Sequence, residues 1–281
     1  MIRVRTLFST MAFALIGALG VAAQAGVADL RYAAPLPASV VFTAVDTMDA
    51  TITGLPTGDS KLTTITEWVS DMQFASGDSG IAVTAALKSF SGVMRSVMGD
   101  LQMHSPDVDP IRFHIGATGA APEALAGANA TALSAAPEET LARSRALAGL
   151  YALPGRTMAP GESWSDSART AETVEEMHFD VSTSIRGTYL ADSVVDGRTL
   201  NVLRVIRESE MTTSGTHEGV DIAQKTTSKS EEFVLWDSTR HIPVSRNAVS
   251  HIDAETELKQ MNVTTKMIAT SRTYITGEAQ N

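Results

Sequence analysis

The chain has 281 residues, which is long enough for one large domain or two coupled halves to bury an adequate hydrophobic core. It contains 22 Lys+Arg against 32 Asp+Glu, and such an acidic chain repels phosphate backbones, which excludes nucleic acid as an expected partner. The chain has no cysteine, which excludes disulfides, thiolate metal sites, a cysteine nucleophile and a lipid-modified cysteine.

Residues 1–25 have the pattern of a secretory signal peptide. Arg3 and Arg5 precede an uncharged apolar run over residues 7–21, and Ala23-Gln24-Ala25 is a cleavage motif. The run is shorter than the roughly 20 residues of a spanning helix, so we favour cleavage over the alternative of a membrane anchor. The mature chain, from Gly26, would carry 20 basic and 32 acidic residues, a net charge of −12. We therefore expect an exported protein, periplasmic or secreted, with no stable membrane anchor after cleavage.

The segment from residue 40 to residue 115 predicts a series of antiparallel strands. Apolar and polar residues alternate over residues 40–52 and 61–74, and a Gly/Pro-rich turn at residues 54–58 separates the two runs. Alternation with a period of two is typical of a strand that is buried on one face. Further strands are expected at residues 81–87, 93–97, 101–103 and 111–115.

An Ala-rich connector over residues 119–152 follows, and Pro137 marks the start of a short helix that ends near Tyr151. Residues 153–164 then form a joint. Its Pro154-Gly155 and Pro160-Gly161 pairs predict two turns that flank a short extended piece. Trp164, directly after the joint, is expected to anchor the core.

Residues 168–276 carry the longest alternating runs. Asp196-Gly197 predicts a hairpin turn, and further turns are expected near residues 214–219 and 237–240. Between residues 242 and 258, one face combines small and apolar side chains with Arg246, Ser250 and Thr256. Long strands joined by tight turns favour a strongly curved sheet.

The fold class expected from these patterns is mainly β with minor α. Long antiparallel strands would form a curved sheet or an open barrel or cup, with one short helix in the connector. Residues 26–281 would be a single exported domain, with possible halves at residues 38–118 and 153–276.

Two pairs of residues have the spacing of metal ligands on one face of a strand: His178 with Asp180, and His251 with Asp253. No further ligand is placed to complete either pair, so a metal site is not favoured. Ser163 lies in a partial G-x-S-x-G pattern without the strand-to-helix context of a nucleophile elbow. We therefore predict no catalytic residues, no metal and no cofactor, and expect that the protein is not an enzyme.

The Leu153-Pro154 and Gly161-Glu162-Ser163-Trp164 motifs resemble those of an uncharacterised family of secreted bacterial β-rich proteins. Residues 233–237 and 240–244 also resemble the late hairpin of that family, although the expected aromatic-Asp-Gly pattern is Trp236-Asp237-Ser238-Thr239 here. In outline such proteins are similar to LolA/LppX-type open barrels, which hold apolar ligands in a cup. The resemblance implies no catalytic residues.

The resulting hypothesis is an exported, soluble, non-enzymatic protein whose partner is an apolar small molecule or lipid held in a β-cup. An envelope protein is the other expected partner, in the alternative that the chain is a structural or assembly module with a filled core. An unrecognised hydrolase is the third possibility. The residues expected to line the cup are Trp68, Met72, Phe74, Trp164, Phe179, Trp236, Met261 and Met267.

Overall fold

The computed structural model describes residues 26–77, 80–97, 99–104, 109–119, 144–174, 176–217 and 219–280. The predicted signal peptide lies outside these ranges, as does most of the connector. Residues 144–146 are the helical part of the connector within the described ranges. Within those ranges, no helix is long and apolar enough to cross a membrane.

Strands dominate the described chain, as the alternation predicted. They are β1 (Ala28–Leu30), β2 (Ser39–Thr53), β3 (Ser60–Gly77), β4 (Gly80–Ser96), β5 (Gly99–His104), β6 (Ile111–Ile115), β7 (Arg156–Met158), β8 (Ser163–Val174), β9 (Met177–Val195), β10 (Arg198–His217), β11 (Val220–Asp237), β12 (Ile242–Leu258) and β13 (Val263–Gln280), with the 3-10 turn η3 (Lys259–Met261) before β13.

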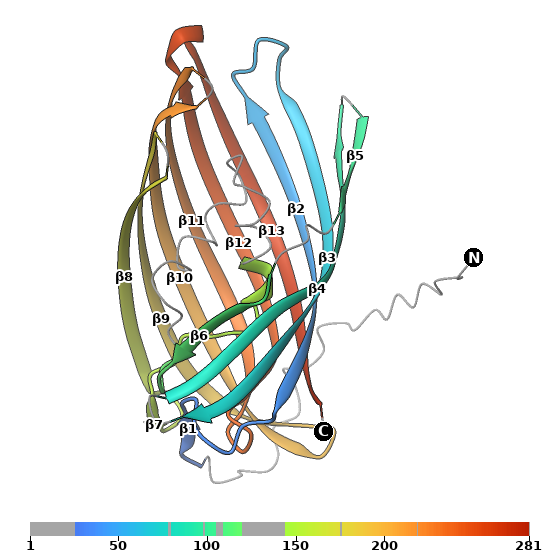
Figure 1. The fold of residues 1–281 in the computed structure, drawn as a ribbon, viewed down its shortest axis with the longest axis vertical. Coiled ribbons are helices and arrows are strands. Elements are labelled where there is room, and N and C mark those ends of the chain that lie inside the picture. Colours follow the sequence, from blue (N-terminus) through green and yellow to red (C-terminus); the bar gives the residue numbers. More distant parts are fainter. Residues whose placement is uncertain are drawn as a thin grey trace, which may run out of the picture.

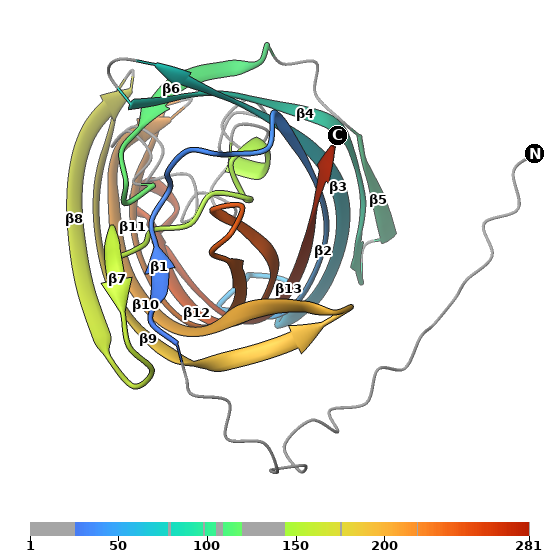
Figure 2. The same cartoon turned by 90° about the horizontal axis from the view of Figure 1, so that it is seen from below.

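Eleven of these strands form one antiparallel sheet in the order β5-β4-β3-β2-β13-β12-β11-β10-β9-β8, and β6 pairs with β4. The sheet curves strongly around a central axis but is not closed (Figures 1 and 2). This confirms the expected mainly β class with long antiparallel strands in a curved sheet. Strands β2 and β13 pair over fifteen residues, so the N-terminal and C-terminal strands belong to one sheet.

The turns follow from local sequence. Asp196 and Gly197, with φ of 51° and 74°, make the tight turn between β9 and β10 that the Asp-Gly pair predicts. In the predicted joint, Gly155 and Gly161 both have positive φ and flank β7, so the two turns and the extended piece are confirmed.

Two segments close one end of the curved sheet, and we call residues 26–38 and 144–158 the end plug. Strands β1 and β7 pair within it and cross the opening of the sheet (Figure 2). The indole Nε1 of Trp236 donates to the Asp29 carbonyl at 3.0 Å, and the Tyr32 ring packs edge-on against Trp236 at 5.2 Å.

Two clusters of buried side chains form the core at this end. The first joins the end plug to β6, β8, β9, β10 and β11, and includes Trp164 and Trp236. The second joins the plug to β2, β3, β4, β12 and β13, and includes Trp68 and Met72. Trp164 is 9% exposed, which confirms its predicted role as a core anchor.

Strand parity separates an inner face from an outer face. The inner face continues the parity of the core residues, for example even-numbered residues in β11 and β12. The outer face carries ion pairs between neighbouring strands. They are Arg204–Glu231 at 2.6 Å, Lys229–Glu208 at 2.7 Å, Lys225–Glu210 at 3.1 Å and Lys266–Glu255 at 2.9 Å.

These exposed pairs give the outer face of β10–β13 a charged surface. A barrel wall that faces hydrocarbon carries an apolar band instead, because a charge at the bilayer midplane costs about 2–4 kcal/mol. Exposed apolar side chains such as Phe233 and Tyr274 also lie on this face, but Phe233 is flanked by the Arg204–Glu231 pair. The outer face of these strands therefore combines ion pairs with exposed apolar side chains.

Candidate functional site

Above the core, the inner face carries charged side chains where the alternation would otherwise place apolar ones. Arg207, Glu232 and Arg246 come from the adjacent strands β10, β11 and β12. Asp46 comes from β2, and Arg145 from the helical turn of the connector. We call these five residues the charged layer.

Glu232 is the centre of the layer and is fully buried. Its carboxylate accepts hydrogen bonds from the Tyr151 hydroxyl at 2.7 Å and from the Ser230 hydroxyl at 2.9 Å. Arg246 Nε lies 3.0 Å from Oε2 and Arg207 Nε lies 3.4 Å from Oε1, although neither N–H is aimed closely enough for a hydrogen bond. Two guanidinium charges thus surround one carboxylate.

This environment fixes the charge state of Glu232. Burial acts to raise the pKa of its carboxyl, but Arg246, Arg207 and the hydroxyls of Tyr151 and Ser230 outweigh burial and lower the pKa to about 2. Burial, followed by the nearby Glu232 charge, raises the pKa of the Tyr151 phenol well above its ordinary value. At neutral pH Glu232 is therefore ionised and Tyr151 is protonated, as their hydrogen bond requires.

Arg145 lies on the other side of the layer and stacks on an aromatic ring. Its guanidinium carbon is 4.3 Å from the centroid of the Trp68 ring, which is a favourable cation–π distance. Burial lowers the pKa of Arg145; the nearby Asp46 opposes this effect and Arg246 adds to it. Among the described residues, no carboxylate lies within ion-pair distance of Arg145.

Asp46 is the second acid of the layer. Its Oδ1 accepts hydrogen bonds from Ser271 at 2.7 Å and from Thr273 at 2.5 Å, both on the neighbouring strand β13. The carboxylate is thus bound by hydroxyls and has no arginine in direct contact among the described residues.

The layer contains buried donors that make no hydrogen bond to any described residue. The Nε–H of Arg145 is one, and the indole N–H of the adjacent Trp68 is another. The Nε–H groups of Arg207 and Arg246 also lack a well-aimed hydrogen bond, although both face the Glu232 carboxylate in ion pairs. The neighbouring inner face adds buried hydroxyls without a partner, at Thr64, Thr66, Ser70, Thr213 and Thr226. Buried polar groups usually have a protein or water partner, so this concentration of unsatisfied groups is unusual.

The end plug packs tightly below the layer. A side chain at Gly149 would place its Cβ 2.4 Å from the Phe42 ring, so the connector approaches β2 closely. A narrow crevice of only about 10 Å³ lies between this part of the connector and β12, next to Arg246 and Tyr151. The apolar end of the molecule is therefore filled by the protein's own side chains.

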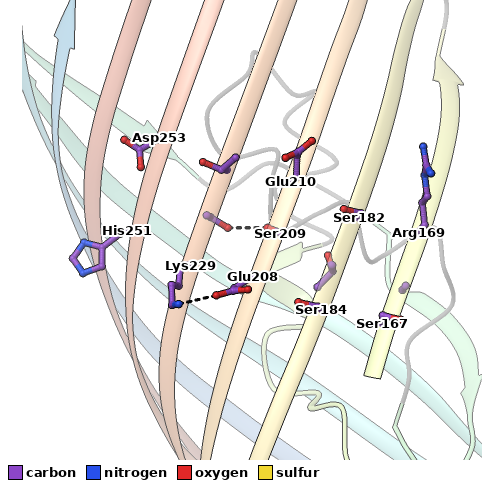
Figure 3. A pocket seen from close by; sticks show the side chains of 14 residues that line it. Ser167, Arg169, Ser182, Ser184, Glu208, Ser209, Glu210, Lys229, His251 and Asp253 are labelled. Carbon is purple, nitrogen blue, oxygen red and sulfur yellow. Dashed lines mark hydrogen bonds and ion pairs between the residues drawn. The ribbon is translucent and has the colours of Figure 1, made fainter. Parts of the chain in front are cut away.

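The outer face has a second candidate, a shallow hollow of about 780 Å³ across β8–β12 (Figure 3). Its lining is polar and its cations are paired: Lys229 with Glu208 at 2.7 Å, and Arg169 with Asp180 at 2.6 Å. Each hydrogen-bonded lysine or arginine lowers the pKa of the acid beside it. Because these charges are satisfied and exposed, the hollow has the properties of a solvated sheet surface.

The two predicted His-Asp pairs do not come together as metal ligands. His178 Nδ1 lies 3.2 Å from the Thr173 hydroxyl, and its neighbour Asp180 binds Arg169. His251 Nδ1 lies 3.3 Å from the Thr270 hydroxyl. In the described ranges no group of three or more His, Cys, Asp or Glu is placed to hold a metal ion. The Ser163 hydroxyl lies 2.9 Å from that of Thr188.

The residues expected to line a cup are divided between the core and the open end of the sheet. Trp68, Met72, Trp164 and Trp236 are buried in the two core clusters, and Phe74 packs against both. Phe179 and Met267 have the inner parity and are half-buried farther along β9 and β13. Met261 is 58% exposed in the turn η3, away from the inner face.

The alternation pattern carried a signal for one member of the charged layer. Arg246 shares its parity with the small and apolar residues of β12, which is unusual for a buried face. Arg145, Arg207, Asp46 and Glu232 were not identified, because the register between strands and the path of the connector decide which charges meet.

Comparison with known proteins finds no matching family model and no matching curated protein. Among solved structures, OccK2 (OpdF) from Pseudomonas aeruginosa matches with a TM-score of 0.26 and 6% identity, over 86% of this chain and 98% of that chain. A BenF-like porin from Pseudomonas fluorescens Pf-5 matches with a TM-score of 0.26 and 6% identity, over 86% of this chain and 100% of that chain. The outer membrane protein opdK from Pseudomonas aeruginosa matches with a TM-score of 0.25 and 8% identity, over 85% of this chain and 99% of that chain. These TM-scores are below 0.5, so the fold and the site rest on the geometry described above.

The expected function, a soluble β-cup holding an apolar ligand, is wrong. Within this chain, Trp68, Met72, Trp164 and Trp236 are covered by the protein's own core, and the inner face above them is charged. The alternative of an envelope module with a filled core stays a prediction.

Proposed function

We propose that this protein is a non-catalytic, open β-barrel of the cell envelope that admits small hydrophilic solutes to its polar interior. The observation that carries the proposal is the charged layer with its unsatisfied donors, which lies on the inner face of a sheet whose one end is plugged. Burying charges without satisfying their donors is costly, and water or a polar solute in the interior would offset that cost.

The sequence supports the envelope location through the signal-peptide pattern of residues 1–25. Sheet size supports an accessible interior. About eight strands enclose a space that side chains just fill, whereas this sheet has eleven strands. The end plug occupies one end of that space, and the inner face beyond the layer is rich in Ser and Thr.

The pKa shifts in the layer support a role other than catalysis. An efficient general acid or base has a pKa near the working pH. The pKa of Glu232 is lowered to about 2 and that of Tyr151 is raised well above its ordinary value, so neither group would exchange protons readily near pH 7.

Cysteine accessibility tests the proposal directly, because the chain has no cysteine of its own. Ser250 lies on the inner face of β12, opposite Ser230 of β11, and the exposed Ser184 lies on the outer face of β9. In folded protein, we expect a small hydrophilic methanethiosulfonate reagent to modify Ser250→Cys within about tenfold of the rate for Ser184→Cys, because reactivity depends on access to the thiolate.

Urea provides the reference for full exposure. If Ser250→Cys reacts only when the protein is unfolded while Ser184→Cys reacts in the folded state, small solutes do not reach the interior and the proposed function fails. Far-UV circular dichroism of both variants must match that of the parent, so that a slow reaction is not confused with misfolding.

A further inference from the structure

We propose that the charged layer is a binding site for a small oxyanion, a carboxylate or a phosphate, held between Arg145 and Arg246 beside Trp68. This inference deepens the proposed function, because it requires that solutes reach the interior and it names the class of solute.

The charges of the layer do not balance. Arg145, Arg207 and Arg246 carry three positive charges, whereas Asp46 and Glu232 carry two negative charges. Glu232 is occupied by Arg207 and Arg246, which leaves Arg145 without an ion-pair partner among the described residues. A buried unpaired charge costs several kcal/mol, so a monoanion bound at Arg145 would offset that cost.

Arg145 has a buried Nε–H that makes no hydrogen bond to any described residue, and its guanidinium carbon lies over the Trp68 ring. The planar edge of a guanidinium carries its N–H groups. Planar bidentate contact with a carboxylate or phosphate uses this edge, and it is the contact for which arginine is better suited than lysine.

Arg246 supplies the second side of the site. Its guanidinium carbon lies 5.8 Å from the centroid of the Tyr151 ring, and its Nε forms an ion pair with Glu232 at 3.0 Å. Both arginines belong to the charged layer, and the charge of Arg246 acts with burial to lower the pKa of Arg145. A bound anion would attract both guanidinium groups and so offset the repulsion between their positive charges.

Asp46 is the competing explanation, because its negative charge lies near both arginines. Its carboxylate, however, accepts hydrogen bonds from Ser271 and Thr273 rather than from a guanidinium. If Asp46 serves as the counterion through water, removing its charge brings no gain in anion binding. If it competes with an external anion, Asp46→Asn tightens binding, because the excess of positive charge rises from one to two.

The experiment is isothermal titration of the folded, mature-length protein with sodium acetate and, separately, with inorganic phosphate, in chloride buffer of constant ionic strength. The variants are Arg145→Gln, Arg145→Lys and Asp46→Asn. The control is Arg272→Gln, which removes the same charge from an exposed position on the outer face of β13. The Nε–H resonance of Arg145, identified by its loss in Arg145→Gln, reports contact with the anion independently of heat.

We expect the parent and Arg272→Gln to bind at least one of the two anions with the same affinity. Arg145→Gln should bind that anion at least about tenfold more weakly, a difference of about 1.4 kcal/mol in binding free energy. Arg145→Lys keeps the charge but loses the planar fork, so it should lie between them, and Asp46→Asn should bind more tightly. Acetate binding without phosphate binding would identify a carboxylate site, and the reverse a phosphate site.

Absence of binding by the folded parent at millimolar anion, or binding that Arg145→Gln leaves unchanged, overturns the inference. The cysteine experiment separates this failure from that of the proposed function. If Ser250→Cys is reactive and no anion binds, the interior is accessible but the layer is not an oxyanion site. If Ser250→Cys is unreactive in the folded state, both proposals fail.

Discussion

Glu232 is the residue on which the charged layer depends. It is the common partner of Arg207, Arg246, Tyr151 and Ser230, and it is fully buried. The Glu232 carboxylate offsets the cost of burying the two arginines, because it lies 3.4 Å from Arg207 Nε and 3.0 Å from Arg246 Nε.

Replacing Glu232 by Gln should therefore be severely destabilising although the side chain keeps its shape. We expect a loss of about 3–5 kcal/mol in the free energy of unfolding, because two buried guanidinium groups lose their countercharge. Urea denaturation monitored by circular dichroism measures this value. Glu231→Gln is the matched control; Glu231 is exposed on the opposite face, and its change should stay below about 1 kcal/mol. Equal effects of the two variants would contradict the role assigned to Glu232.

The pH dependence of stability follows from the same carboxyl. The pKa of Glu232 is lowered from 4.5 to about 2 in the folded state, so the unfolded chain binds a proton more readily. The resulting stabilisation is fully present above pH 4.5 and is lost as the pH falls from 4.5 towards 2; it amounts to roughly 3 kcal/mol.

Unfolding free energies measured between about pH 2 and pH 6 test this expectation. The parent should show a stability that decreases steeply with acidification in this window, and the slope should be smaller in Glu232→Gln than in Glu231→Gln. A slope unaffected by loss of Glu232 would assign the acid sensitivity to other carboxyls.

At the scale of elements, one close approach joins β8 to β9. Gly187 lies opposite Trp164 in the register of the two strands, and a Cβ on Gly187 would lie 2.1 Å from the indole ring. Trp164 is fixed in the core cluster that holds the end plug, so the ring has little room to move. The anchor predicted from sequence thus depends on a glycine in the adjacent strand.

Gly187→Ala should cost about 1–3 kcal/mol, because overpacking a filled core forces side chains out of their preferred rotamers. The midpoint of urea denaturation measures the cost. Gly116→Ala is the control, since a Cβ there meets no atom within 4 Å and its φ is not positive. If Gly187→Ala is as stable as Gly116→Ala, then Trp164 is not held as rigidly as the structure indicates.

At the scale of the whole molecule, the pairing of β2 with β13 makes the N-terminal and C-terminal strands one structural unit. Fifteen residue pairs connect them, and no β-bulge interrupts the register. Because the two core clusters also share partly buried residues such as Phe74 and Leu150, we expect the sheet and the end plug to unfold together.

A proline in the middle of β13 tests this cooperativity. Thr270 has hydrogen-bonded strands on both sides, so Thr270→Pro should cost at least about 3 kcal/mol, through a lost ladder bond and a steric clash. Ala171→Pro in the edge strand β8, which pairs only with β9, should cost less. Tryptophan fluorescence and far-UV circular dichroism should give coincident transitions in the parent and in both variants, and separate transitions would contradict a single unit.

The sequence alone determined the period of the strands, the turns and the anchor. Alternation with a period of two appears wherever one face of a strand is buried, and the Asp196-Gly197, Pro154-Gly155 and Pro160-Gly161 turns depend on backbone preferences of the residues themselves. Trp164 was predictable because it is a large aromatic side chain at the end of a turn. These features depend on neighbours in sequence.

The charged interior depends on contacts between strands and the connector that are far apart in the sequence. Arg246 had the inner parity, but nothing in the sequence places it 3.0 Å from Glu232, because that contact depends on the register of β11 with β12. Tyr151 reaches Glu232 from the connector, 81 positions earlier in the chain, and Arg145 reaches Trp68 from the same segment. Alternation along single strands cannot predict such a path.

Alternation shows which side chains share a face but not what covers that face. The aromatic and methionine side chains on the inner faces therefore led to the expectation of an apolar cup. The structure packs most of the aromatic ones into a core instead, since burying their area is worth more than lining a cavity with it. Parity shows which side chains share a face, but only the path of the end plug decides whether that face is covered or open.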